Sequence, residues 1–139
     1  GMYTLGTPSN PQLDIGYPMH ARGGIAGVTI YSTDEQATGG IWLDGRPIYR
    51  KTFSGATTDS NGFIQIGEMP TDFAQAVRMY GTISFGTQTL LIPNAFYQSL
   101  AYMITPVIDG QAVSLALGSG FGSGQKRYVL SIEYTKNTD

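Results

Sequence analysis

The residues that could perform catalysis are few and scattered in this sequence. His20 is the single histidine, and there is no cysteine. A Ser-His-Asp triad or a paired-histidine metal site therefore has little support, and His20 is interpreted as a surface or arm-packing histidine. Asp34 and Glu35 are expected to be solvated, and Glu133 is expected to face solvent from a strand. No two carboxylates stand out as the pair that glycoside hydrolysis requires.

The sequence therefore predicts a protein that is not an enzyme and that holds no metal and no cofactor. Two loops resemble ligand sites only superficially. "DSNG" (59–62) lacks the later carboxylates of a calcium loop, so a turn is expected there. "GSGFGSGQKR" (118–127) lacks the spacing of a phosphate-binding loop. It is expected to be a mobile hairpin loop that presents Phe121 as an adaptable contact, or else a flexible connection.

A hairpin is predicted in "GGIWLDGRPIYRKTF" (39–53), where Asp44-Gly45 suits a two-residue type I′ turn. This register places Ile41 opposite Ile48, and these two residues and Leu43 are expected to face the core. The opposite face then carries the residues predicted to contact a ligand or a second subunit, namely Trp42, Pro47, Tyr49 and Phe53. Core packing or a subunit interface is favoured for this face over a platform for sugar rings.

The remaining strands follow from alternation of apolar and polar residues. They are predicted at 62–67, 78–86, 87–93, 99–105, 112–117 and 127–136. Helix-like spacing at 72–80 leaves one or two helical turns as an alternative. Glycine is abundant, at 19 residues, as expected of a chain with many turns. These features predict an all-β fold, an antiparallel, jelly-roll-like β-sandwich of about seven to eight strands.

Composition limits the classes of partner that the protein is expected to bind. The net charge is −2, which gives no electrostatic reason to bind nucleic acid or an anionic membrane. No apolar run is long enough to insert into a membrane, and no signal peptide is recognised. Residues 1–30 are rich in Gly and Pro and are predicted to form an extended N-terminal arm. Residues 31–139 are predicted to form the β-sandwich module.

The stretch "YSTDEQATGGIWLDGRPIYRKTF" resembles a recurrent block in the C-terminal β-rich modules of bacteriophage and prophage tail proteins. The matching positions are Tyr31 to Gln36, Trp42, Asp44-Gly45, Pro47 and Tyr49-Arg50-Lys51. The ending "EYTKNTD", from Glu133 to Asp139, is similar to the family's closing strand, with Asn137 substituted. The resemblance spans about residues 31–139, departs from the family at Gly39-Gly40 and in "EMPTDFAQAV", and carries no established binding residues.

The resemblance implies a structural domain of a tail fibre or tail tip, located in the virion tail and made in the bacterial cytoplasm. It implies self-association as a homotrimer, contact with other tail proteins and host-surface attachment, with a host-surface glycan as a candidate ligand. If the protein is a tail domain, the predicted hairpin at 39–53 is a structural signature of the module. The alternative function is a bacterial carbohydrate-binding module or adhesin domain. A cell-surface enzyme with an unmarked pair of carboxylates is a weaker third option.

Overall fold

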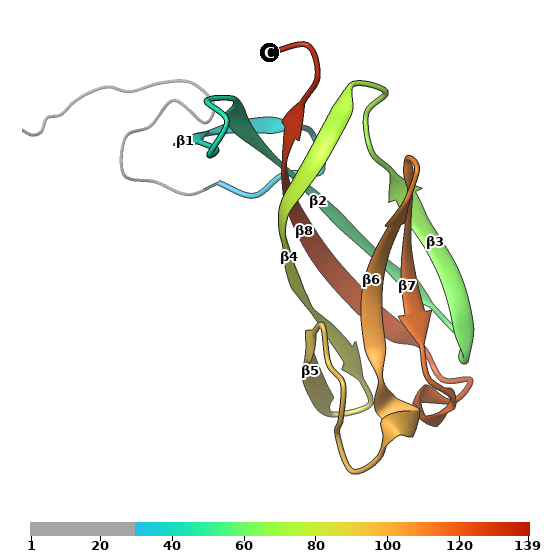
Figure 1. Ribbon diagram of the computed structural model, residues 1–139. Helices are drawn as coiled ribbons and strands as arrows, with labels where there is room; N and C mark the ends of the chain where they lie inside the picture. The colour runs from blue at the N-terminus through green and yellow to red at the C-terminus, as the bar shows by residue number, and fades with distance from the viewer. Residues whose placement is uncertain (1–29) are drawn as a thin grey trace, which may run out of the picture. The chain divides into compact units, whose positions relative to one another are not determined.

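The structure is a computed structural model that describes residues 30–139. The predicted arm, except Ile30, and His20 lie outside the described residues. Residues Ser32–Asp139 pack as one unit (Figure 1). Its elements are β1 (Gln36–Ile41), β2 (Pro47–Thr57), β3 (Gly62–Glu68), β4 (Phe73–Phe85), β5 (Gln88–Ile92), the 3-10 helix η1 (Leu100–Tyr102), β6 (Ile104–Asp109), β7 (Ala112–Leu117), the 3-10 helix η2 (Ser119–Phe121) and β8 (Lys126–Lys136).

The strands form two antiparallel sheets that face each other. One sheet has the order β1-β2-β8-β4-β5 and the other has the order β3-β7-β6. The last strand, β8, lies between β2 and β4, and β7 lies beside β3, so sequence neighbours are often not sheet neighbours. This order is typical of Greek-key sandwiches rather than of a simple meander. The predicted all-β, jelly-roll-like sandwich of about eight strands is confirmed.

The core lies between the sheets and follows the predicted alternation. On β8, Leu130, Ile132 and Tyr134 point inward and are fully buried. On β7, every second side chain enters the same core. The buried apolar residues of the core are Phe53, Met69, Ile83, Ile92, Ile104, Val113, Leu115, Leu117, Phe121, Leu130, Ile132 and Tyr134. Burial of large apolar side chains at about 1.5–3 kcal/mol each is the main source of stability for this fold.

The hairpin between β1 and β2 differs from the prediction in its turn and its register. Trp42 N–H donates to Arg46 O at 2.9 Å, and Gly45 N–H donates to Trp42 O at 3.0 Å. The loop therefore has three residues, with Gly45 in the left-handed region at φ 87°. A type I′ turn would need positive φ at Asp44 as well, whereas the three-residue loop needs it only at the glycine. Ile41 consequently pairs with Pro47 instead of Ile48.

The predicted facing of this hairpin was also wrong. Ile41 and Leu43 are 64% and 91% exposed, whereas Phe53 is 6% exposed and belongs to the core. Strand β2 takes its orientation from continuous pairing with β8, in which Phe53 lies opposite Leu130. The sheet, rather than the short hairpin, decides which face of β2 is buried, because opposite residues on paired strands share a face.

Two other segments depart from the prediction. Residues 73–85 form one continuous strand, β4, so the helical alternative for 72–80 is wrong. The strand predicted at 99–105 begins only at Ile104, and Leu100–Tyr102 form η1, whose N-cap Ser99 accepts a hydrogen bond from Ala101 N–H. A hydroxyl at this position satisfies a free backbone donor and favours a helical turn over a strand. Strand β6 includes Pro106, which is tolerated because β6 lies at a sheet edge.

Candidate functional site

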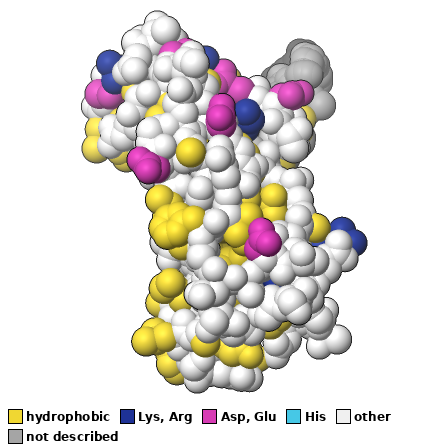
Figure 2. Space-filling view, turned by 90° about the vertical axis from the view of Figure 1, so that its right-hand side faces the viewer, with side chains coloured by type: hydrophobic (Ala, Val, Ile, Leu, Met, Phe, Trp, Pro, Cys, Tyr) yellow, Lys and Arg dark blue, Asp and Glu magenta, His cyan; other side chains and the backbone are white. Residues whose placement is uncertain are grey.

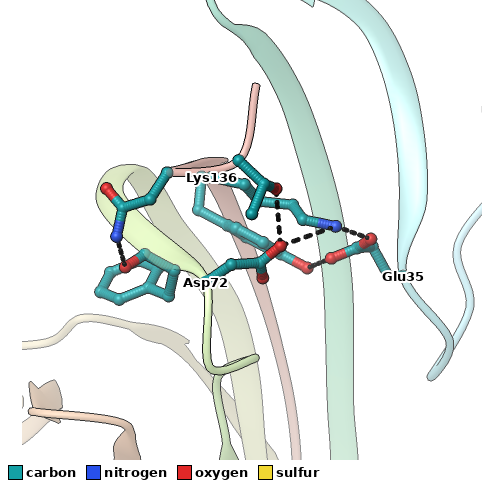
Figure 3. A network of polar contacts seen from close by, with 7 residues as sticks. Glu35, Asp72 and Lys136 are labelled. Atoms are coloured by element: carbon teal, nitrogen blue, oxygen red, sulfur yellow. Dashed lines mark hydrogen bonds and ion pairs between the residues drawn. The ribbon is translucent and has the colours of Figure 1, made fainter.

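A cluster of charged and polar side chains ties the two ends of the described chain together (Figure 3). Glu35 precedes β1, Lys136 ends β8, and Asp72 precedes β4. Lys136 Nζ lies 2.8 Å from Glu35 Oε2 and 3.4 Å from Asp72 Oδ2. The ammonium group of Lys136 is therefore shared between two carboxylates that come from distant parts of the sequence. We call Glu35, Asp72 and Lys136 the terminal cluster.

Tyr134 connects the terminal cluster to the core. Its ring is fully buried, and its hydroxyl donates to Glu35 Oε1 at 2.6 Å. Burial, followed by the hydrogen bond to Glu35, raises the pKa of Tyr134 far above its usual value. Glu35 therefore uses both carboxylate oxygens, one for Tyr134 and one for Lys136. Glu35 is exposed, as predicted, but its two partners were not foreseen, because they lie about one hundred residues away and leave no local pattern.

The other charged members are held in their ionised forms. Burial opposes ionisation of Asp72, but hydrogen bonds from Thr138 and the Lys136 ammonium outweigh it, and the pKa of Asp72 lies below its usual value. The hydrogen bond to Glu35 raises the pKa of Lys136, although desolvation acts in the opposite direction. Thr138 Oγ1 lies 2.9 Å from Asp72 Oδ2. The terminal cluster thus fastens the segment after β8 to the segment before β4.

Glu133 lies on the outer face of the five-stranded sheet and is also paired. Arg50 Nη1 is 3.6 Å from Glu133 Oε2, and Tyr80 Oη donates to the same oxygen at 3.0 Å. The side chain of Glu133 faces outward, as predicted, but these partners leave it only 17% exposed. Arg50 lies on β2 directly opposite Glu133, and Tyr80 lies on β4 opposite Ser131, so its hydroxyl reaches Glu133 diagonally.

The five predicted contact residues do not form one surface. Trp42 is half-buried beside the hairpin turn, and Pro47 begins β2. Tyr49 packs on Tyr134, with 6.2 Å between ring centroids, and Lys136 Nζ lies 4.7 Å from the Tyr49 ring centroid. A hydrogen bond with Asp139 raises the pKa of Tyr49. Tyr49 therefore belongs to the surroundings of the terminal cluster, and Phe53 belongs to the core.

The glycine-rich segment is ordered by packing, which corrects the prediction of a mobile loop presenting Phe121. Phe121 is 5% exposed and packs edge-on against Phe85 at 5.0 Å between ring centroids. Lys126 is fully buried, and its ammonium donates to Gly122 O and Gly124 O, each at 2.6 Å. A buried charge requires such hydrogen bonds, and the two bonds from Lys126 fix the conformation of the loop on its buried side.

Three of the loops at one end of the sandwich, residues 86–87, 93–103 and 118–125, have a different chemistry. These three loops contain no Asp, Glu, Lys, Arg or His. Leu91 and Leu100 are each 72% exposed, and Phe96 is 64% exposed. On the face shown in Figure 2, hydrophobic side chains gather over the lower half and most charged ones over the upper half. We call the three loops together with β5 the uncharged end.

Aromatic rings connect the core to the surface of the uncharged end. Tyr102 lies 5.7 Å from Phe121 and 5.5 Å from Tyr97 between ring centroids, edge-on in both cases. Tyr97 is half-buried, and its hydroxyl accepts hydrogen bonds from the side-chain amides of Gln88 and Gln98, the latter at 3.1 Å. Rings in this arrangement restrict one another, so Tyr97 is held from below by a ring and from the sides by two amides.

Sequence reasoning missed Tyr97, Gln88 and Gln98. A usable signal was present, because between Met79 and Gln125 the sequence contains a single charged residue, Asp109. So long an uncharged stretch in a protein that is 13% charged indicates that the loops within it differ in chemistry from the rest of the surface. The pairing of Gln88 with Tyr97 across the loop could not be predicted, because the path of residues 93–103 is irregular.

Within residues 30–139, no group of three His, Asp or Glu side chains stands close enough together to hold a metal ion. The same part of the chain contains no helix long and apolar enough to cross a membrane. An open groove of about 390 Å³ is lined by Ala76, Val77, Arg78, Met79, Pro93, Thr105 and Pro106. No protein-family model, curated protein or solved structure matches this chain.

Proposed function

We propose that this protein is a non-catalytic structural domain of a bacteriophage or prophage tail, displayed for attachment to the host surface. The tail assignment rests on the two sequence blocks that resemble tail proteins. The terminal cluster adds a physical reason to treat them as one feature, because Glu35 of the first block binds Tyr134 and Lys136 of the second. In this proposal, the residues that resemble tail proteins stabilise the scaffold, and other parts of the surface make the contacts with partners.

The observation that carries the attachment role is the exposure of large apolar side chains on the loops of the uncharged end. Exposed contiguous apolar surface is unusual on a soluble domain and is typical of a contact region. Loops held by a rigid sandwich are a common place for recognition, because the scaffold fixes their position. In this proposal, β1 and the C-terminal residues face the rest of the tail, and the uncharged end faces the host.

The proposed partners are other tail proteins and further copies of this chain, arranged as a homotrimer, with the virion tail as the location. Carbohydrate binding within a bacterial polysaccharide-degrading system is the second candidate, and it is favoured by the amide and aromatic groups around Tyr97. A tail domain would be found on phage particles, whereas a carbohydrate-binding module would be found with polysaccharide-degrading proteins. The location of the protein therefore distinguishes the two candidates.

Immunogold electron microscopy tests the proposal. Antibodies against the purified protein are applied to phage particles, or to particles released by prophage induction, from the strain that encodes the gene. We expect labelling at the tail of intact particles, and the matched control is an antibody against a cytoplasmic protein of the same strain. Unlabelled particles, with the protein instead found in the secreted or cell-bound polysaccharide-degrading fraction, would overturn the tail assignment.

A further inference from the structure

We propose that the uncharged end carries a binding site for a neutral glycan, centred on Tyr97, Gln88 and Gln98, a proposal that rests on the attachment role proposed above. Both carboxamides donate to the Tyr97 hydroxyl oxygen. These two bonds occupy the acceptor capacity of that oxygen, so the Tyr97 O–H proton is free to donate outward. Among the described residues, no protein group donates to the carbonyl oxygen of either carboxamide.

The remaining hydrogen-bonding capacity fits hydroxyl groups. Each carboxamide retains one carbonyl oxygen and one N–H, so the site presents two donor–acceptor pairs beside one hydroxyl donor. A sugar hydroxyl both donates and accepts, and neighbouring hydroxyls on a pyranose ring can engage both atoms of one carboxamide. The apolar faces of sugar rings pack on exposed aromatic and aliphatic side chains, and Phe96 and Leu100 supply such surface next to Tyr97 in the chain.

The charge distribution selects a neutral ligand. The loops of the uncharged end carry no charged side chain. The nearest buried cation, Lys126, already donates to Gly122 O and Gly124 O, so its ammonium is committed to the protein. Asp109 is the last residue of β6, whereas the uncharged end adjoins the start of that strand at Ile104. Two exposed charged residues, Asp59 in the turn between β2 and β3 and Arg127 at the start of β8, lie at the same end of the sandwich but outside these loops. A sulfated, phosphorylated or sialylated glycan would find no ion-pairing partner in the three loops themselves.

The backbone at Gln98 supplies an independent reason to assign a role to this site. Gln98 has φ 63°, in the region that favours glycine, and Ser99 N–H donates to Tyr97 O at 2.6 Å. This is a three-residue turn of the rare, strained kind. Strain of this type is found preferentially at functional sites, where the surrounding structure maintains it. The strained turn aims the Gln98 carboxamide at the Tyr97 hydroxyl.

The composition of the three loops also agrees with recognition. They are rich in Gly, Ser and Tyr, which are among the residue types that dominate the binding loops of antibodies. There, aromatic side chains supply rigid contact area and the small polar residues supply hydrogen bonds. Because the glycine-rich loop is held by Phe121 and Lys126, the surface is largely formed before any ligand arrives, which lowers the entropic cost of binding.

The experiment uses the full chain on an array of neutral and anionic glycans, followed by calorimetric titration of the strongest neutral ligand. We expect binding to neutral glycans with an affinity that changes by less than about twofold between 50 and 500 mM NaCl, because no ion pair is involved. The double variant Gln88→Ala/Gln98→Ala should weaken binding by at least about tenfold, through the loss of two carboxamides.

The control is Gln65→Ala, which removes an exposed glutamine from β3 and should leave the affinity unchanged. Tyr97→Phe is the second variant, because it keeps the ring packing on Tyr102 and removes only the hydroxyl. Circular dichroism verifies that each variant is folded. The proposal is overturned by a lack of neutral-glycan binding, by binding that survives both site variants, or by salt-sensitive binding to anionic glycans alone. Those outcomes leave tail labelling by immunogold unaffected, so this failure is distinguishable from failure of the proposed function.

Discussion

At the residue scale, Gln98 combines a strained backbone with a side chain that holds a neighbouring ring. A non-glycine residue in this region costs on the order of 1–3 kcal/mol, and one exposed hydrogen bond returns about 0.5–1.5 kcal/mol. We therefore predict that Gln98→Gly leaves the free energy of unfolding unchanged or raises it by up to about 1 kcal/mol. The same variant should weaken glycan binding, because it removes the Gln98 carboxamide from the proposed site.

Urea denaturation of the full chain measures this effect, with Asn61→Gly as the matched control. Asn61 also has positive φ, at 61°, but it lies in the turn before β3, outside the three loops of the uncharged end. Its replacement should preserve glycan binding and change stability less, because asparagine tolerates this conformation better than glutamine. A clear loss of stability in Gln98→Gly would contradict the prediction and assign Gln98 a structural role.

At the scale of elements, the packing of η1 against the glycine-rich segment depends on a missing side chain. A Cβ atom at Gly118 would lie 2.3 Å from Ala101 O, whereas one at Gly124 would meet nothing within 4 Å. We predict that Gly118→Ala lowers the free energy of unfolding by about 2–3 kcal/mol, because backbone must move to relieve the overlap. Gly124→Ala should change it by less than about 0.5 kcal/mol. Equal effects of the two substitutions in thermal denaturation would show that backbone entropy dominates.

The elements also show what local sequence determines. Strands β7 and β8 were predicted with the correct inward faces, because their apolar residues alternate. On β8, Ser131 and Thr135 on the opposite face are also buried, which the alternation did not indicate. The hairpin at Asp44-Gly45 was located correctly, but its loop length and facing were not, because these depend on the pairing of β2 with β8. Residues 99–105 have an alternation typical of a strand, yet Ser99 caps a helical turn in their place.

The candidate site was less predictable than the fold for a related reason. Phe121 lies in a glycine-rich loop, and such composition normally indicates mobility. Its burial depends on contacts with Phe85 and Tyr102 and on hydrogen bonds from Lys126 to the loop. None of these contacts can be recognised from the sequence of the loop itself. Glu35 and Lys136 are likewise brought together only by the sheet order. Contacts between distant strands and irregular loops therefore account for the errors.

At the scale of the whole molecule, the terminal cluster predicts how stability depends on pH. The folded-state pKa of Asp72 lies below its ordinary 3.8, so its contribution is present above that value and is lost as the pH falls through the folded-state pKa. The folded-state pKa values of Lys136 and Tyr134 are raised above 10.5 and 10.0, so their contributions are present below those values and are lost at higher pH. We predict a plateau of stability between about pH 5 and 9.

Urea denaturation of the full chain from pH 3 to 11 measures this dependence as the free energy of unfolding. Tyr134→Phe removes one ionisation and should make the alkaline decline shallower, while the acidic decline remains. The matched control is Tyr31→Phe, because Tyr31 is 53% exposed and lies outside the terminal cluster. A free energy of unfolding that increases between pH 9 and 11 would contradict the sign of both raised pKa values.

The assembly of the protein is the last prediction, and it concerns the apolar residues left exposed at the opposite end from the glycan site. Ile41 and Leu43 extend from the β1–β2 hairpin at 64% and 91% exposure. Burying a side chain of this size is worth about 1.5–3 kcal/mol before the cost of association. A trimer that buries these side chains on all three copies gains this free energy several times. We expect the full chain to be a homotrimer, because cyclic closure buries a hairpin patch on every copy without open-ended growth. Light scattering at micromolar concentration measures the mass, and Ile41→Ser/Leu43→Ser should shift it towards the monomer while Leu91→Ser, at the uncharged end, leaves it unchanged. A monomeric full chain, or a trimer that is insensitive to the hairpin variant but broken by Leu91→Ser, would show that this hairpin does not hold the assembly together.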